Sequence, residues 1–249
     1  MIFCLILVNE MSEKLQTGLA QLHFTPEQIN SLSTMMDTYI REIILFNSAY
    51  NLTNTSDYDE IVIFHILDSL SAVKKIQNIA ECISKNPQEV QIADIGSGGG
   101  LPGIPLAAAL PQYNFTLVER MDKRCAFLEN AVAILGLKNV VVLKAEAERV
   151  ATESFDIVTF RAFHPLDKKI TKTLLSLLKR GGFLAAYKAK KENIKTEMNE
   201  IKTLIPNYEV FPLSVPFLTD APIDSNTLNL DLRERNLMVM GRMPKSIFK

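Results

Sequence analysis

Cysteine is scarce in this chain, and the few cysteines present form no pattern of a metal site or a disulfide framework. Cys4, Cys82 and Cys125 are odd in number and far apart. Structural zinc sites need closely spaced ligands, and disulfide scaffolds need an even and larger number of cysteines. The sequence therefore predicts no metal ion and is typical of a protein of the reducing cytoplasm.

An excess of charge of one sign is also missing. The 27 Lys and Arg residues and the 28 Asp and Glu residues give a net charge of −1. Without overall positive charge, the chain has no long-range field that attracts nucleic acid. Any surface that binds RNA must then be a local patch of basic residues.

Long hydrophobic runs are absent as well. The first run, residues 2–8, is far shorter than the roughly 18 apolar residues of a membrane-spanning helix. No Lys or Arg precedes it and no small-residue cleavage site follows, so we expect neither a signal peptide nor a membrane partner. Because Met11 begins an ordinary start, residues 1–11 are expected to be an extension or an alternative start.

The most informative stretch is residues 91–103, QIADIGSGGGLPG. An apolar run reaches Asp94 and then breaks into glycines at positions 96, 98, 99 and 100, before a second apolar run begins. This order predicts a buried strand, a tight loop and the start of a helix. Glycine lets a ligand approach the backbone closely, and the first N–H groups of the helix face that ligand.

Two interpretations of this loop compete. The dinucleotide fingerprint G-x-G-x-x-G fits Gly98, Gly100 and Gly103, whereas a methyltransferase loop D-x-G-x-G-x-G fits Asp94, Gly96, Gly98 and Gly100. A carboxylate beside a pyrophosphate is repelled by it. In the second interpretation Asp94 can accept from the amine of a methionine moiety, directly or through water. We therefore favour a methyltransferase site that contains Asp94, Gly96 and Gly98.

The pattern along the 249 residues predicts an α/β fold. Residues 12–88 have helical spacing, with Thr25 and Pro26 at a helix start and a polar loop over residues 46–61. From residue 89 to 249, strands and helices alternate, which predicts a Rossmann-like class I methyltransferase domain with a doubly wound, mostly parallel sheet. The expected strands lie near residues 91–95, 115–119, 140–144, 155–160, 182–188, 209–215 and 236–240.

In such a sheet, ligands bind beyond the carboxyl ends of the strands. Glu119 ends the second strand, about 20 residues past the glycines, where a ribose-binding acid is expected. Ala147 and Glu148 follow the third strand, where a backbone N–H and a nearby carboxylate can bind the adenine edge. Arg161 and Lys188 end the fourth and fifth strands and are candidates for contacts with cofactor or RNA.

His65 and Asp68 are three residues apart in a predicted helix, so their side chains share one face. A catalytic pair is one interpretation. A buried structural hydrogen bond, or a face turned towards the nucleoside site, is the interpretation that we favour.

Several segments together resemble one family. In order, they are FNSAYNLT (46–53), HILDS (65–69), DIGSGGGLPGIPLA (94–107), FTLVE with KRCAFLE (115–129), TFRAF (159–163), AYKAK (186–190) and RNLMVM (235–240). The combination resembles the small-subunit ribosomal RNA methyltransferase G family, also called glucose-inhibited division protein B, over residues 11–240. The departures are Phe46, where the family often has Trp, Phe64, where Arg is frequent, and a short basic tail.

The resemblance implies an S-adenosylmethionine-dependent enzyme that methylates N7 of guanosine 527 in the 530 loop of 16S rRNA. Carried over by motif, the cofactor site implied by the family consists of Gly96, Leu101, Glu119, Ala147, Glu148 and Arg161. The implied partner is 16S rRNA, either naked, in an assembly intermediate or in the 30S subunit, and we expect a monomer.

The motifs of other RNA methyltransferases are absent. Adenine-amine enzymes usually carry (Asn/Asp)-Pro-Pro-aromatic after the fourth strand, and pyrimidine C5 enzymes need a cysteine there. This chain has Arg161-Ala162-Phe163-His164-Pro165 instead. Guanine N7 carries no proton, so no general base is needed, and catalysis can rest on alignment. We expect Phe163 to stack on the base, with Arg161 and Lys188 as further candidates.

Two other functions stay open at this point. One is an NAD-dependent Rossmann oxidoreductase, which Asp94 disfavours. The other is a non-catalytic ribosome-assembly factor that has kept the fold.

Overall fold

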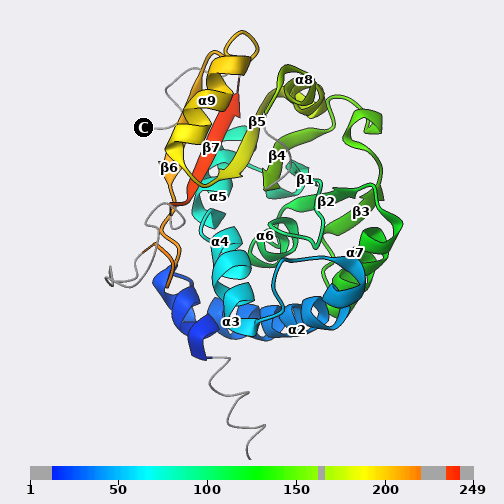
Figure 1. Ribbon diagram of the computed structural model, residues 1–249, viewed down its shortest axis with the longest axis vertical. Coiled ribbons are helices and arrows are strands. Elements are labelled where there is room, and N and C mark those ends of the chain that lie inside the picture. Colours follow the sequence, from blue (N-terminus) through cyan, green and yellow to red (C-terminus); the bar gives the residue numbers. More distant parts are fainter. Residues whose placement is uncertain (1–12, 162–165, 220–233, 242–249) are drawn as a thin grey trace, which may run out of the picture.

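The computed structural model describes residues 13–161, 166–219 and 234–241. Their strands form a seven-stranded sheet in the order β3-β2-β1-β4-β5-β7-β6 (Figure 1). The strands are β1 (Gln91–Ile95), β2 (Asn114–Glu119), β3 (Val140–Lys144), β4 (Phe155–Arg161), β5 (Leu178–Lys188), β6 (Tyr208–Pro212) and β7 (Asn236–Gly241). Strands β1 to β5 pair in parallel, and β7 is antiparallel to both β5 and β6.

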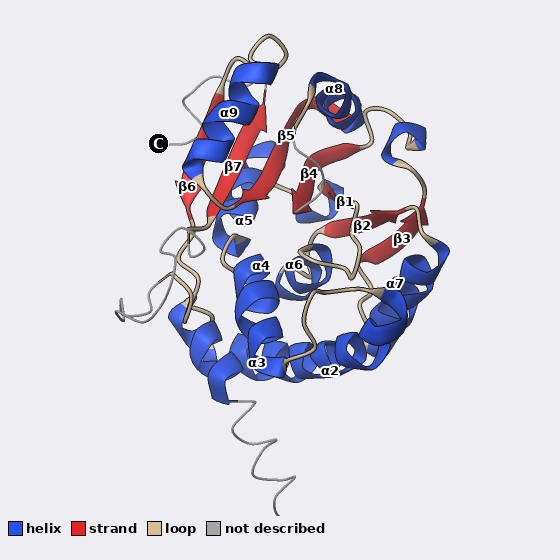
Figure 2. Cartoon of the chain, viewed as in Figure 1, coloured by secondary structure: helices blue, strands red, loops and turns tan. Residues whose placement is uncertain are grey.

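The helices occupy both faces of this sheet (Figure 2). Residues 13–21 are helical. The other helices are α2 (Pro26–Tyr50), α3 (Tyr58–Ile61), the π-helix η1 (Val62–Leu67), α4 (Asp68–Leu70), α5 (Val73–Ile83), η2 (Pro87–Glu89), α6 (Gly103–Ala109), α7 (Asp122–Ile134), η3 (Ala147–Arg149), α8 (Lys168–Leu177) and α9 (Lys191–Ile201). The mostly parallel α/β architecture predicted from the sequence is confirmed.

The sheet separates two apolar clusters because successive side chains of a strand point to opposite faces. On one face, Ile92 and Ile157 pack with residues of α2, α5, α6 and α7. On the other face, Ala93 and Val158 pack with residues of α8 and α9. The N-terminal helices share the first cluster with the sheet, and α2 lies next to α6 and α7 (Figure 1). The site at the sheet edge therefore has helical segments fixed against it.

The start of α2 follows the predicted signal. Thr25 accepts a hydrogen bond from Gln28 N–H at 3.3 Å, and the Gln28 side chain accepts from Thr25 N–H at 3.0 Å. Pro26 stands in the first turn, where its missing N–H leaves no bond unmade. This reciprocal cap fixes where the longest helix begins.

The loop predicted over residues 46–61 is too long. Helix α2 continues to Tyr50, and α3 already begins at Tyr58. The cause is Asn47, a buried helical residue whose Oδ1 accepts from Leu52 N–H and Thr53 N–H, both at 2.9 Å. The polar composition of this stretch therefore includes a helical residue whose side chain shapes the loop that follows.

The switch in strand order lies between β1 and β4, since their crossovers run in opposite directions from this point. The glycine loop, residues 96–102, leaves β1 there and leads into α6. Among the described residues, no helix is long and apolar enough to cross a membrane.

Candidate functional site

A cavity of about 890 Å³ opens at this switch point. It is lined by the loop after α2, the helices that follow, the glycine loop and the ends of β4, β5 and the start of β7. We call residues 94–101 with Glu119 the glycine-loop wall, and residues 52–68 the helical wall. The volume is within the range of small-molecule sites.

The glycine loop is fixed by backbone hydrogen bonds. Gly96 N–H and Ser97 N–H donate to Val118 O at 2.9 and 3.1 Å, and Gly100 N–H donates to Ser97 O at 2.7 Å. Gly96, Gly98 and Gly100 have φ of 69°, 57° and 88°, a region that favours glycine. The loop thus has a defined shape that side chains at these positions would strain.

Glu119 lies behind this loop and is 4% exposed. Its Oε2 accepts from Gly98 N–H at 2.9 Å, and its Oε1 accepts from Arg120 N–H and Met121 N–H at 2.8 and 2.9 Å. A carboxylate oxygen has two lone pairs, so Oε2 can take one further donor. The carboxylate therefore supports the loop and retains capacity for one further hydrogen bond.

Asp94 is buried deeper, with 1% exposure, beneath the start of α6. Its Oδ2 accepts from Gly103 N–H at 3.1 Å, and Thr159 Oγ1 lies 3.4 Å from its Oδ1. Burial raises the pKa of Asp94 to about 7, although these hydrogen bonds and the charge of Arg161 act to lower it. Asp94 is thus poised between its neutral and ionised forms near neutral pH.

The loop leaves room for a ligand at one glycine in particular. A Cβ added to Gly98 would meet only Gly96 O at 3.9 Å and Arg124 Nη1 at 4.0 Å. At Gly103, by contrast, a Cβ would lie 2.3 Å from Leu117 Cδ2. The two glycines therefore serve different needs, an open approach to the backbone at Gly98 and close packing of α6 on β2 at Gly103. The open position fits a nucleoside cofactor.

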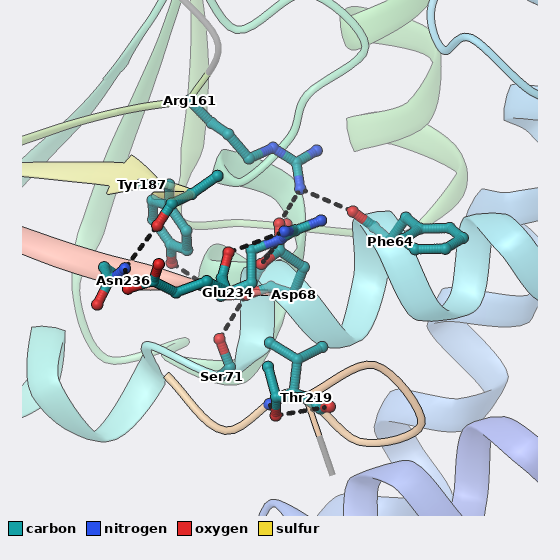
Figure 3. A network of polar contacts seen from close by, with 12 residues as sticks. Phe64, Asp68, Ser71, Arg161, Tyr187, Thr219, Glu234 and Asn236 are labelled. Atoms are coloured by element: carbon teal, nitrogen blue, oxygen red, sulfur yellow. Dashed lines mark hydrogen bonds and ion pairs between the residues drawn. The ribbon is translucent and has the colours of Figure 1, made fainter. Parts of the chain in front are cut away.

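The helical wall is joined to the sheet by an ion-pair network (Figure 3). Arg161 extends from the end of β4 towards Asp68, and its Nη1 lies 2.9 Å from Asp68 Oδ2. Arg235 Nε lies 3.5 Å from Asp68 Oδ1. The Asp68 side chain is 5% exposed and the two arginine side chains are 14% and 18% exposed. One buried carboxylate thus faces two guanidinium groups at the cavity.

His65 contacts the same arginine. Arg161 Nη2 lies 3.2 Å from His65 Nδ1, and because a guanidinium can only donate, Nδ1 is the acceptor. Burial, with the charges of Arg161 and Arg235, lowers the pKa of His65 to about 3. The predicted link of His65 and Asp68 is therefore indirect, since both side chains contact Arg161 at the cavity.

Five of the predicted site residues line the cavity, namely Gly96, Gly98, Leu101, Arg161 and Lys188. Lys188 Nζ forms a partly buried ion pair with Glu197 at 2.6 Å. Asp94 and Glu119 lie behind the lining, as described. Ala147 and Glu148 are in η3 outside the lining, and the Glu148 side chain is exposed. Phe163 lies outside the described residues.

The sequence interpretation missed part of the lining. The missed residues are Leu52 to Thr55, Glu60, Phe64, Arg124, Tyr187, Arg235 and Asn236. A signal existed for Arg235 and Asn236, because they begin the RNLMVM segment of the family resemblance. In the structure β7 is antiparallel to β5, so its first residues lie beside the last residues of β5. For the helical wall the signal was limited to His65 and Asp68, whose shared face was expected to turn towards the site, and both residues line the cavity.

Comparisons with known proteins identify the family of this chain. Residues 32–226 match the family described as rRNA small subunit methyltransferase G. The protein named Ribosomal RNA small subunit methyltransferase G of Treponema denticola is 42% identical over 223 residues, covering 81% of this chain and 88% of the relative. The protein of that name in Borrelia garinii subsp. bavariensis is 36% identical, covering 83% and 89%.

A solved structure supports the fold. The tRNA (m1A58) methyltransferase TrmI from Aquifex aeolicus superposes with a TM-score of 0.51 at 14% identity, covering 81% of this chain and 74% of that one. At this identity the similarity concerns the fold alone, which is that of a methyltransferase.

Proposed function

This chain belongs to the rRNA small subunit methyltransferase G family, and on that premise we propose that it methylates N7 of a guanosine in 16S rRNA with S-adenosylmethionine as donor. The target that the family resemblance implies is guanosine 527 in the 530 loop. The substrate would be the 30S subunit or its rRNA at an earlier stage, so the protein would act in the bacterial cytoplasm. The family gives no support to an NAD-dependent oxidoreductase.

The single observation that carries the proposal is the family match, because residues 32–226 include the glycine loop, Glu119 and Arg161. The geometry supports it in three respects. Gly98 leaves room for a ligand, Glu119 keeps an acceptor position for a ribose hydroxyl, and the cavity extends from there to the helical wall. We keep Asp94, Ala147 and Glu148 as proposed contacts of the methionine and adenine parts.

Methylation at N7 requires little acid or base catalysis from this chain. When bound, S-adenosylmethionine supplies an electrophilic methyl group on a sulfonium. N7 of guanine would take that methyl group through its lone pair as the carbon–sulfur bond breaks, which would leave a neutral thioether. N7 loses no proton, so the positive charge would pass from sulfur to the purine. The protein must hold the base in line and exclude water. With its pKa lowered to about 3, His65 stays neutral throughout the pH range in which the enzyme works.

The testing experiment is single-turnover methylation of 30S subunits from a strain that lacks this protein. The RNA is then digested and the methylated nucleoside identified by mass spectrometry. We expect 7-methylguanosine from the 530 loop. Methylated adenosine or cytidine would overturn the proposal. So would an absence of methylation on 30S subunits that persists when naked rRNA and assembly intermediates are offered as substrates.

A further inference from the structure

We propose that Glu60 and Phe64 form the guanine-recognition site, with the Glu60 carboxylate accepting from N1–H and the N2 amine of the base and the Phe64 ring stacking on it. The inference rests on the proposed function and names the residues that would distinguish guanine from other bases. It starts from two side chains of the helical wall that are exposed at the cavity and are not needed to hold the fold together.

Both side chains are available to a ligand. Glu60 is exposed and lines the cavity, and within the described parts of the chain no hydrogen bond or ion pair engages its carboxylate. Phe64 also lines the cavity and is 39% exposed, although large aromatic residues are usually buried. The two residues are four positions apart, which places them on the same side of a helix.

The helix that carries them is held in place. Arg161 Nη1 donates to Phe64 O at 3.3 Å as well as to Asp68 (Figure 3). At the other end, Asp57 caps α3 by accepting from Glu60 N–H at 2.9 Å. The backbones of Glu60 and Phe64 are therefore fixed relative to the end of β4, which lines the same cavity. A rigid backbone is what specific recognition of a base requires.

The chemistry of guanine matches this pair. N7 lies on the major-groove edge, while N1–H and the N2 amine lie on the Watson–Crick edge across the ring. Enzymes that modify a base generally bind its Watson–Crick edge by hydrogen bonds and stack its faces on apolar side chains. Two adjacent donors fit the two oxygens of one carboxylate. Adenine presents an acceptor at N1, which the carboxylate would repel.

The same contact assists the reaction. Methylation at N7 puts a positive charge on the purine, and this makes N1–H and the N2 amine better donors. Their hydrogen bonds to Glu60 would strengthen as the charge develops, so they would stabilise the transition state more than the bound substrate. Glu60 would then affect the rate of methyl transfer as well as substrate binding.

The test combines a protein change with a base change. We would measure single-turnover methylation by wild type and Glu60→Gln on 30S subunits whose 16S rRNA carries guanosine or inosine at the target, introduced by ligating a synthetic segment. Inosine keeps N7 and N1–H but lacks the N2 amine. On guanosine, Glu60→Gln should slow the reaction about 10- to 100-fold, the range for losing a bidentate base contact. The methylation rate of wild type should fall about tenfold when inosine replaces guanosine, and the rate of the variant should fall much less.

Controls separate recognition from folding. S-adenosylmethionine affinity should be unchanged in Glu60→Gln, and Glu200→Gln, which neutralises an exposed glutamate of α9, should behave as wild type. For the ring, Phe64→Leu should reduce the rate roughly 5- to 100-fold, and Phe64→Trp should retain it, because stacking on a base is worth about 1–3 kcal/mol. If Glu60→Gln does not fold, Glu60→Asp replaces it.

A wild-type rate for Phe64→Leu on guanosine would overturn the assignment of Phe64. Equal inosine penalties in wild type and variant, or a wild-type rate for Glu60→Gln on guanosine, would overturn the assignment of Glu60. If wild type itself fails to methylate guanosine, the proposed function is at fault instead.

Discussion

The glycine-loop wall and the helical wall differ in where their carboxylates find partners. On the glycine-loop wall, Asp94 and Glu119 are buried and accept from backbone N–H groups. On the helical wall, Asp68 faces two arginines and Glu60 is exposed to the cavity. The first wall therefore owes its shape to its own backbone, and the second is attached by side chains from distant strands. The glycine-loop wall is thus suited to a cofactor that is the same in every turnover, and the helical wall is suited to recognition of the substrate base.

The largest effect is expected where the helical wall joins the sheet. Asp68→Ala leaves Arg161 and Arg235 without the carboxylate between them, in a buried position. Breaking a buried pair in this way costs about 3–5 kcal/mol of unfolding free energy. Chemical denaturation of Asp68→Ala would measure the loss.

The matched control is Glu146→Ala, which removes an exposed ion pair with Arg149. It should cost less than about 1 kcal/mol. Equal stabilities of the two variants would show that the arginine network does not hold the wall.

The next effect concerns binding rather than stability. Gly98→Val should keep the fold, at a backbone cost of about 1–2 kcal/mol for φ of 57°, because a Cβ there meets no atom closer than 3.9 Å. Its side chain would fill the space that the cofactor needs, so affinity should fall more than about 100-fold, or about 2.7 kcal/mol. Calorimetric titration with S-adenosylmethionine measures it.

Gly136→Val gives the comparison for strain alone. Gly136 has a similar φ of 65°, a Cβ added to it would meet no atom within 4 Å, and it lies away from the cavity at the end of α7. The variant should lose similar stability and no affinity. If both variants lost affinity, the loss in Gly98→Val would be due to backbone strain and not to a side chain that fills the cofactor site.

A smaller change is expected at the ribose position. Glu119→Ala removes the proposed acceptor of a ribose hydroxyl and the support of Gly98 N–H, so binding should weaken by about 1.5–3 kcal/mol. Glu148→Ala, at an exposed position outside the lining, should weaken it by less than about 1 kcal/mol. Calorimetric titration of both variants with S-adenosylmethionine compares the two losses of affinity. A larger loss for Glu148→Ala would indicate that the ribose binds nearer to η3.

The effects of pH on stability have opposite signs on the two walls. Asp94, with its pKa raised to about 7 from an ordinary value of 3.8, binds a proton more tightly in the folded protein, so its stabilising contribution is full below pH 3.8 and is lost as pH rises from there to about 7. His65, with its pKa lowered to about 3 from 6.5, contributes stability that is lost as pH falls below 6.5.

Thermal unfolding between about pH 3.5 and 8.5 tests these signs. Asp94→Asn should match wild type at the acidic end and exceed its stability at the basic end, because the amide cannot ionise. If ionised Asp94 binds the amine of the cofactor, wild-type affinity should also rise as pH increases through neutrality, and that of Asp94→Asn should stay constant. A variant less stable than wild type at the basic end would contradict the raised pKa.

The sequence predicted the sheet well and one wall of the cavity better than the other. Strands such as residues 140–144 are short apolar runs between turn signals, and their alternation with helices predicts a mostly parallel sheet. The glycine-loop wall is local in sequence, so its motif and its structure coincide. Arg161 and Lys188 were found because strand ends converge at one edge.

The helical wall could not be predicted in the same way. The position of Glu60 depends on the buried Asn47, on the cap at Asp57 and on Arg161 from another element. Each of these contacts is ordinary in isolation, and only the folded chain brings them together at the cavity. Composition suggested a polar loop there, whereas the structure has a helix end, a short loop and a new helix.

The ties between the helical wall and the late strands also determine when this protein can become active during synthesis. Tyr187 donates to Ser69 O at 2.8 Å across 118 residues of sequence, and Arg235 reaches Asp68 from still farther along the chain. The N-terminal helices therefore leave the translating ribosome well before their partners exist. Contacts so distant in sequence form slowly, so the helical wall should be the last part of the site to assemble. The enzyme would thus acquire its substrate selectivity only once nearly the whole chain has been made.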